Sequence, residues 1–298
     1  MALSCACAVL AATRLTPIEA AQAPAAADRP LGAVSGLDAA AVALRSRQAM
    51  AALDRYLETW NSRDPVIWAT SLHFPHVRPG PGAFELFNTP EAYAASVNFA
   101  QTLGTGWHHS EWVSREVVQV GVDKVHVAGS WERYTEDGRP QTSSAILYVV
   151  TNHDGRWAIQ SRLAAGTGTI DPQTASRNGS AALAALNAFM DAWNAHDPKR
   201  LAESIHYPHV RLADNLVEVW HSAEQYLNGP EPGRQRTWYR TQLDRAKVIQ
   251  TTANGVNIQV TFSRLGRDGR ILTEDEGIFL ATLRDGAWKI QARSTMGT

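Results

Sequence analysis

The sequence contains one unit twice, and this repeat constrains the fold more than any other feature. The motif WNxxDP begins at Trp60 and recurs at Trp193, 133 positions later, and the motif HxPHVR recurs with the same offset. After a two-residue deletion the offset becomes 131, and the motif DGxWxIQxR that begins at Asp154 recurs at Asp285. Each copy is much longer than the roughly 20–50 residues of a solenoid repeat. The sequence therefore predicts two complete, homologous domains in tandem.

The repeat divides the chain into four expected segments. We expect an Ala-rich leader over 1–43, a first domain over 44–165, a linker over 166–180 and a second domain over 181–298. The linker contains Gly, Thr, Pro, Asn and Ser, which is typical of a connection between domains. A chain of 298 residues is long enough for two domains of ordinary size.

The leader allows two interpretations of where the protein resides. Its apolar start contains both cysteines, Cys5 and Cys7, and the sequence AAQA over 20–23 resembles a cleavage site of small residues. However, no Lys or Arg precedes the apolar run, and Arg14 follows it. An exported protein with a signal peptide in 1–23 and a cytoplasmic protein with a disordered leader or a misplaced start both remain open. Because no cysteine follows, we expect no disulfide, thiolate nucleophile or Cys-ligated zinc in the folded part.

Composition and the absence of common motifs narrow the field of functions. The chain has 28 Lys and Arg against 29 Asp and Glu, so its net charge of -1 argues against a nucleic-acid partner. No apolar run approaches the ~20 residues of a membrane span. The sequence contains no GxxxxGK[ST], no HExxH and no GxSxG motif. Any catalysis is therefore expected to need no cofactor and no metal.

Periodicity predicts helices in the first half of each copy and strands in the second. Apolar residues three or four apart between Leu44 and Asn61 predict a helix, and Asp64 before Pro65 predicts the start of a short second one. A third helix is expected near 89–103. The remaining residues alternate with period two between Asp-Gly turns, which predicts long antiparallel hairpins and an α+β fold. The alternation also leads us to place Trp131 and its counterpart Phe262 on an outer face of the sheet.

This order of elements, together with WNxxDP, HxPHVR and DGxWxI, resembles the NTF2-like superfamily. The SnoaL-like branch, which includes polyketide cyclases and relatives of ketosteroid isomerase, is the most similar. The resemblance covers both copies and implies two cone-shaped α+β barrel domains, each with helices packed in a curved, mostly antiparallel sheet around an apolar pocket. It also implies that the two domains pair within the chain as a pseudo-dimer, and association into a homo-oligomer is left open. Because the superfamily contains isomerases, cyclases, dehydratases, epoxide hydrolases and pockets without chemistry, the fold does not decide the function.

The HxPHVR motif supplies the first candidate site. His76 and Arg78 are two residues apart on an expected strand and share a face, and His209 and Arg211 repeat the pair. A His of near-neutral pKa can act as a general base, and a nearby Arg can stabilise an enolate or carboxylate oxygen. Alternatively, both pairs bond to helix ends or neighbouring strands and hold the fold together. His73 points away from His76, so no metal site is expected from this motif.

The strand expected after Trp107 supplies the second candidate site. Aromatic, hydroxyl and imidazole side chains on one face suit a pocket for a small apolar or amphipathic ligand that carries a carbonyl group. The expected members are His108, Ser110, Trp112 and Tyr134 in the first copy and Tyr239 and Thr241 in the second. The alternative is an aromatic layer that packs on the helices.

Two functions of different classes follow, and the sequence does not decide whether the chain is an enzyme. The first is a cofactor-free acid–base enzyme of the isomerase, cyclase or dehydratase type, acting on a small and largely apolar carbonyl compound. In it His76 is the acid or base, Arg78 stabilises the oxyanion, and His108 positions the ligand. The second is a non-catalytic protein that binds a small ligand or a protein partner.

Overall fold

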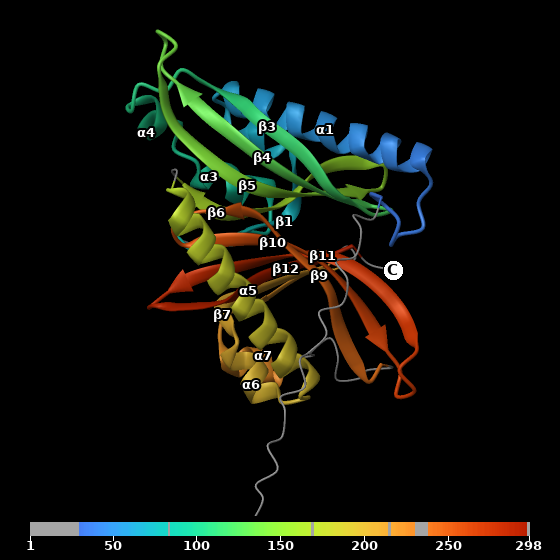
Figure 1. Cartoon of the computed structure of the whole chain (residues 1–298). Coiled ribbons are helices and arrows are strands. Elements are labelled where there is room, and N and C mark those ends of the chain that lie inside the picture. Colours follow the sequence, from blue (N-terminus) through green and yellow to red (C-terminus); the bar gives the residue numbers. More distant parts are fainter. Residues whose placement is uncertain (1–29, 83, 168–169, 214–215, 230–237, 297–298) are drawn as a thin grey trace, which may run out of the picture.

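The computed structural model describes residues 30–82, 84–167, 170–213, 216–229 and 238–296. Each copy of the repeat forms one sheet with its own helices, and the two sheets meet in the middle of the molecule with helices on the outer sides (Figure 1). The expected signal peptide lies outside the described residues.

The first copy packs four helices against a mixed sheet. The helices are α1 (Ala39–Asn61), α2 (Pro65–Ala69), α3 (Pro90–Ser96) and α4 (Phe99–Leu103). The strands are β1 (Leu72–Arg78), β2 (Glu85–Phe87), β3 (His109–Val120), β4 (Lys124–Tyr134), β5 (Pro140–His153) and β6 (Arg156–Thr167). They follow the order β2-β1-β6-β5-β4-β3, in which only β1 and β6 run parallel.

The second copy repeats this arrangement. Its helices are α5 (Pro172–Asn194), α6 (Pro198–Glu203) and α7 (Ala223–Asn228). Its strands are β7 (Ile205–Ala213), β8 (Leu216–Trp220), β9 (Arg240–Thr251), β10 (Gly255–Leu265), β11 (Ile271–Arg284) and β12 (Ala287–Thr295). The order β8-β7-β12-β11-β10-β9 matches that of the first sheet strand for strand, so the predicted tandem α+β fold is confirmed. Both sheets are open, and neither closes into a barrel.

Side-chain caps start the second helix of each copy, as the sequence predicts. Asp64 Oδ1 accepts hydrogen bonds from the backbone N–H groups of Val66 and Ile67, at 2.8 and 3.2 Å. Asp197 caps α6 in the same way, at 3.0 and 3.1 Å. Each Asp is followed by a Pro at the first helical position, where the missing N–H costs no hydrogen bond.

The long first helices begin earlier than the expected domain boundaries. Helix α1 starts at Ala39, inside the expected leader, because Asp38 accepts from the N–H of Ala41 at 2.7 Å. Helix α5 starts at Pro172, inside the expected linker, because Asp171 accepts from the N–H of Thr174 at 2.9 Å. In both cases an Asp cap outweighs a local composition that suggests a loop.

The expected third helix is two helices. Val97 interrupts it with an extended backbone (φ -90°, ψ 124°), and Asn98 then caps α4 by accepting from the N–H of Gln101 at 3.0 Å. The interruption places Val97 at the rim of a cavity described below.

The expectation that Trp131 and Phe262 face outward is wrong. Val125, Val127 and Trp131 point from β4 toward α1 and belong to the core of the first domain, and Phe262 belongs to the core of the second. The opposite face of β4, which carries His126, is the one that meets the other domain. A period of two separates the faces of a strand but does not tell which one the helices cover.

The two sheets pack face to face through an apolar layer. Its buried members are Val77, Val118, Leu147, Val149 and Leu163 from the first domain and Val210, Leu212, Ile278, Leu280 and Ala292 from the second. Equivalent polar contacts cross the layer in both directions. Gln119 Nε2 donates to the carbonyls of Val260 and Gly277, at 3.2 and 3.1 Å, and Gln250 Nε2 donates to those of Gly129 and Ile146, both at 3.2 Å. Each acceptor is 131 positions from its counterpart, so the domains pair as a pseudo-dimer within one chain.

Candidate functional site

A cavity of about 220 Å³ lies between α1 and the concave face of the first sheet. The helices supply aromatic side chains to its wall, and the strands supply cations. Its lining residues are Tyr56, Leu57, Trp60, Trp68, Arg78, Glu85, Ser96, Val97, Ser110, Trp131, Arg133 and Arg162. Three arginines therefore face one small space with a single carboxylate among the lining residues.

Arg78, at the end of β1, is held by three neighbours. Its Nη1 donates to Glu85 Oε2 at 3.2 Å, its Nη2 donates to the hydroxyl of Tyr93, and its Nε lies 3.4 Å from His76 Nε2. The guanidinium carbon also lies 5.4 Å from the centre of the Trp68 ring. These contacts fix the guanidinium plane of Arg78 at the edge of the cavity.

His76 lies behind Arg78 and does not line the cavity. Its side chain is fully buried, and its Nδ1 is 3.3 Å from the carbonyl of Ile159. A proton on Nδ1 donates to this carbonyl and leaves Nε2 as the acceptor for Arg78. Burial, followed by the charges of Arg78 and Arg162, holds the pKa of His76 well below its usual range. A neutral His76 thus positions Arg78, while its expected role as acid or base stays a prediction.

Arg133 and Arg162 are the other two arginines of the first cavity. The Nε atom of each is buried and has no hydrogen-bond partner in the described part of the chain. Both guanidinium groups lie over aromatic rings: Arg133 is 5.3 Å from the centre of the Trp60 ring, and Arg162 is 5.7 Å from that of Tyr56. Burial, and then the charge of Arg162, lowers the pKa of Arg133. The first cavity therefore brings several positive charges close together among aromatic rings.

The second domain has a cavity of about 200 Å³ at the corresponding place. Its wall contains Phe189, Met190, Trp193, Arg211, Trp238, Thr241, Phe262, Arg264, Arg293 and Thr295. Arg211 forms an ion pair with Glu218, as Arg78 does with Glu85.

One substitution changes the charge of the second cavity. Arg264 Nη2 lies 3.5 Å from Oδ2 of Asp275, whose side chain is 4% exposed. The first domain has Ser144 at the position of Asp275, so its corresponding Arg133 has no such carboxylate. Arg264 of the second cavity therefore has a buried carboxylate partner that Arg133 of the first cavity lacks.

His209 occupies the place of His76 in the second domain. It is fully buried and stacks on Trp220 with ring centres 5.9 Å apart. Burial, and then the charge of Arg293, holds the pKa of His209 well below its usual range. It too lies outside the cavity wall.

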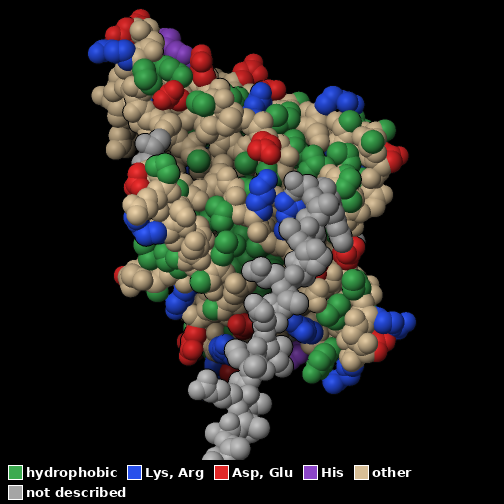
Figure 2. All heavy atoms as spheres, in the orientation of Figure 1, with side chains coloured by type: hydrophobic (Ala, Val, Ile, Leu, Met, Phe, Trp, Pro, Cys, Tyr) green, Lys and Arg blue, Asp and Glu red, His purple; other side chains and the backbone are tan. Residues whose placement is uncertain are grey.

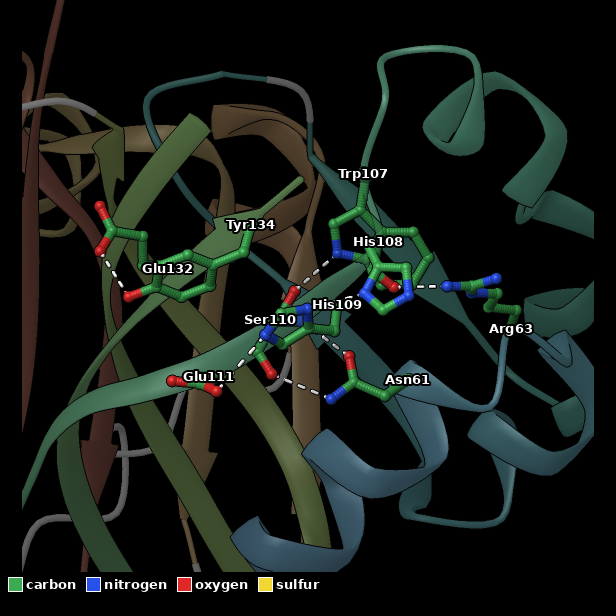
Figure 3. Close-up of polar contacts among 9 residues, drawn as sticks. All are labelled: Asn61, Arg63, Trp107, His108, His109, Ser110, Glu111, Glu132 and Tyr134. Atoms are coloured by element: carbon green, nitrogen blue, oxygen red, sulfur yellow. Dashed lines mark hydrogen bonds and ion pairs between the residues drawn. The ribbon is translucent and has the colours of Figure 1, made fainter. Parts of the chain in front are cut away.

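Ser110 and Thr241 line the cavities, as expected for pocket residues, and both hydroxyls accept from tryptophans. Ser110 Oγ is 3.0 Å from Nε1 of both Trp60 and Trp107. Figure 3 shows the contact with Trp107 and the hydrogen bonds between Asn61 and the backbone of Ser110. Thr241 Oγ1 is 3.2 Å from Trp193 Nε1. These contacts attach β3 to α1 and β9 to α5.

Trp112 packs in the core of the first domain and is not part of the cavity wall. Its ring centre lies 5.5 Å from that of Tyr148, and it is a partly buried member of the apolar cluster under α1. The alternative interpretation of this strand, an aromatic layer against the helices, describes Trp112 better than a pocket role.

The structure places His108, Tyr134 and Tyr239 away from both cavities, which corrects the face expected for them. His108 and Tyr239 precede the first residues of β3 and β9, so the alternation of the strands does not extend to them. Tyr134 follows the inward-facing Arg133 and therefore points outward, where its hydroxyl donates to Glu132 at 2.9 Å (Figure 3). Tyr239 is 51% exposed.

Sequence reasoning missed Arg133 and Arg162, the residues that define the cavity. Arg162 ends the DGxWxIQxR motif, and Arg133 shares a face with Trp131. Both recur in the second copy as Arg264 and Arg293. An arginine that is repeated at an inward-facing position of a core strand was the signal that could have identified them.

The described residues contain no group of three or more His, Cys, Asp or Glu side chains placed to hold a metal ion. His73 instead stacks on His153, with ring centres 4.0 Å apart. Within the described ranges, no helix combines the length and apolarity needed to cross a membrane. On the face drawn in Figure 2, acidic and basic side chains are interspersed.

Comparisons with known proteins identify the first domain by sequence. Residues 47–167 match the model of a family described as NTF2-like protein (DUF6841). None of the curated proteins matches the chain.

Several solved structures resemble part of the chain. A protein of unknown function with a cystatin-like fold from Nostoc punctiforme is 16% identical over 44% of this chain and 96% of its own, with a TM-score of 0.36. A ketosteroid isomerase-like protein from Erwinia carotovora atroseptica is 20% identical over 42% of this chain and 96% of its own, with a TM-score of 0.33. A putative scytalone dehydratase from Novosphingobium aromaticivorans is 14% identical over 44% and 89%, with a TM-score of 0.34.

Proposed function

Because this chain is an NTF2-like protein with two tandem domains, we propose that its first domain binds a small anion with an aromatic or apolar body. The observation that carries the proposal is the group of Arg78, Arg133 and Arg162 around one aromatic cavity that contains only Glu85 as a lining carboxylate. An enclosed excess of positive charge is costly unless an anion accompanies it.

The chemistry of arginine favours a carboxylate or another planar oxyanion as that anion. A guanidinium group presents several N–H donors in a fixed plane and bonds to two oxygens of one carboxylate at once. Arg133 and Arg162 both line the cavity, so a bound oxyanion would accept hydrogen bonds from the parts of their guanidinium groups that face it. It would also relieve the repulsion between these two cations.

The size and the aromatic wall of the cavity define the body of the ligand. A volume of about 220 Å³ is below the roughly 300–1,000 Å³ that drug-sized ligands occupy, so a compound with a single ring fits best. Tyr56, Trp60 and Trp131 offer ring faces and edges for stacking against it. The proposed ligand class is therefore small aryl or cycloalkyl carboxylates.

Isothermal titration calorimetry with benzoate and its neutral analogue benzamide tests this proposal. We expect benzoate to bind at one site and benzamide to bind at least about tenfold more weakly, because only benzoate bonds to the guanidinium groups as an ion. Arg133→Gln should weaken benzoate binding by a similar factor. The matched variant Arg264→Gln, at the same position of the second domain, should leave it unchanged. Equal affinity for the two compounds, or equal losses in the two variants, would contradict the proposal.

A cofactor-free acid–base enzyme is the second candidate, and the position of Glu85 is what favours it. This carboxylate lines the cavity, its side chain is 42% exposed, and it bonds to Arg78. Glu85 could remove a proton from the carbon next to a ligand carbonyl while an arginine stabilises the enolate oxygen. Incubation with acetophenone in D₂O tests this: deuterium should enter the methyl group, and Glu85→Gln should stop the exchange. An unchanged exchange rate in Glu85→Gln would exclude Glu85 as the base, whereas a loss in His76→Ala alone would favour the histidine.

A further inference from the structure

A cleft of about 430 Å³ lies between the two domains. The first domain contributes the segment that follows β1, over 79–82, and residues Ala164 and Gly166 of β6. The second domain contributes the turn between β9 and β10, over 252–254. The cleft is thus a composite of both copies of the repeat.

The cleft adjoins the cavity of the first domain at its arginines. Arg78, Glu85 and Arg162 line both spaces, so these three side chains stand at the boundary between them. An oxyanion bound at Arg78 and Arg162 would lie within reach of the aromatic cavity on one side and of the interdomain cleft on the other.

The walls of the cleft are held in place by hydrogen bonds across the domain boundary and within the second domain. Arg284 Nη2 of the second domain donates to the carbonyl of Gly80 at 2.7 Å, which fixes the segment after β1. Asn178 Nδ2 donates to the carbonyls of Thr252 and Ala253 at 2.8 and 3.1 Å, which fixes the turn. The cleft is therefore a preformed space with polar groups on its walls.

The corresponding place beside the second domain is filled. Lys124 begins β4, and its Nζ donates to the carbonyls of Leu212 and Thr295, at 3.3 and 2.7 Å. Leu212 and Thr295 are the counterparts of Pro79 and Ala164, which line the open cleft. The counterpart of Lys124 is Gly255, which has no side chain to place in the cleft. One exchange, lysine against glycine, closes one site and leaves the other open.

We propose that the interdomain cleft is a second subsite of the first domain's ligand, in which the second domain's turn over 252–254 contacts a polar extension of that ligand. The inference rests on the proposed function and deepens it by naming the ligand class. The ligand has a ring for the cavity, a carboxylate for the three arginines that line it, Arg78, Arg133 and Arg162, and a hydrogen-bonding extension for the cleft. An N-acylated aromatic amino acid has this combination of groups.

Two probes that differ only in the extension test the subsite. Both 3-phenylpropanoate and N-acetylphenylalanine carry the same ring and carboxylate, and only the second has an acetamido group. We expect calorimetry to show about three- to tenfold tighter binding of N-acetylphenylalanine, the gain of about one hydrogen bond in a partly enclosed site. Ala253→Trp places a large ring on the exposed turn and should remove this gain while leaving the affinity for 3-phenylpropanoate unchanged.

The repeat supplies a matched control, because Val122 is the counterpart of Ala253 and is 50% exposed beside the filled site. Val122→Trp should change the binding of neither probe. Gly255→Lys, which copies Lys124 into the open cleft, should act like Ala253→Trp. Equal affinities for the two probes, with no effect of Ala253→Trp, would overturn the subsite and leave the proposed function standing. Binding of neither probe, together with no binding of benzoate, would overturn both.

Discussion

The two domains share one backbone and the same three inward-facing arginines, yet they treat the charge of those arginines differently. In the second domain, Asp275 pairs with Arg264 inside the protein, whereas the first domain has Ser144 at that position. The wall also changes, since Tyr56 of the first domain is Phe189 in the second. The comparison teaches that the fold keeps these arginines with or without a paired carboxylate, and the absence of a partner for Arg133 at the position of Asp275 supports the proposed ligand.

The domain interface also differs between its two equivalent places, and again the first domain has the more open one. The place beside the second domain is filled by Lys124, and the one beside the first is left open by Gly255. The additional counter-ion, Asp275, and the filled site therefore both lie beside the second domain's cavity. Both differences support the proposal that the first domain binds the ligand while the second domain contributes to the cleft from across the interface.

Giving the first cavity the counter-ion of the second should have the largest effect. Ser144→Asp places a carboxylate beside Arg133, at the position of Asp275, and so competes with any bound anion. We expect benzoate binding to weaken by about 10- to 100-fold, the loss of one or two charged hydrogen bonds. Isothermal titration calorimetry measures it. Ser144→Asn, which has the same shape without the charge, should retain most of the affinity, and an equal loss in both variants would show that space, not charge, matters.

The interface difference can be tested by removing Lys124. Its ammonium group bonds to two carbonyls that water does not easily reach, so Lys124→Met should lower the free energy of unfolding by about 2 kcal/mol in urea titrations. Lys124→Gly copies the open site and admits water to those carbonyls, so its loss should be smaller. If Lys124→Met were as stable as the wild type, packing of the alkyl chain rather than hydrogen bonding would explain the filled site.

A buried histidine at the domain interface, present only in the first domain, makes the free energy of unfolding depend on pH. His126 bonds to Gln119 through Nδ1 and to Ser294 through Nε2, both at 2.8 Å, and its counterpart is Asn257. Burial, and then the charge of Lys124, holds the pKa of His126 well below 6.5. Below pH 6.5 the unfolded chain therefore binds a proton that the folded protein does not, and stability falls as the pH falls.

His126→Asn should remove this contribution. Relative to its own value at pH 8, the free energy of unfolding at pH 5.5 should fall by about 1.4 kcal/mol less in the variant than in the wild type. Urea titrations at the two pH values measure the difference. An identical pH dependence in the two proteins would mean that His126 has the same pKa in the folded and unfolded states.

The sequence predicts features of this fold that follow from motifs, but not side-chain positions that depend on contacts between distant segments. The duplication can be read directly from repeated motifs, and the Asp64 and Asp197 caps and the Asp-Gly turns are local patterns. The structure has all of these features. The site was harder because period two cannot tell which face of a strand the helices cover. Because Trp131 and Arg133 share a strand face, placing Trp131 on the outer face also places Arg133 there. The same assignment wrongly turns Tyr134 toward the pocket. The burial of His76 also depends on contacts with Ile159 and Arg78 that only the folded chain brings together.

Features that both domains share should respond equally, and the helix caps provide the smallest and cleanest test. Asp64→Ala and Asp197→Ala each remove an acceptor of two backbone N–H groups at the start of a short helix. Each should cost about 1 kcal/mol of unfolding free energy in urea titrations. Because α2 carries the cavity residue Trp68, Asp64→Ala should also weaken benzoate binding slightly, whereas Asp197→Ala should not. Equal stability losses with unequal effects on binding would separate what the duplicated fold needs from what the first domain alone has acquired.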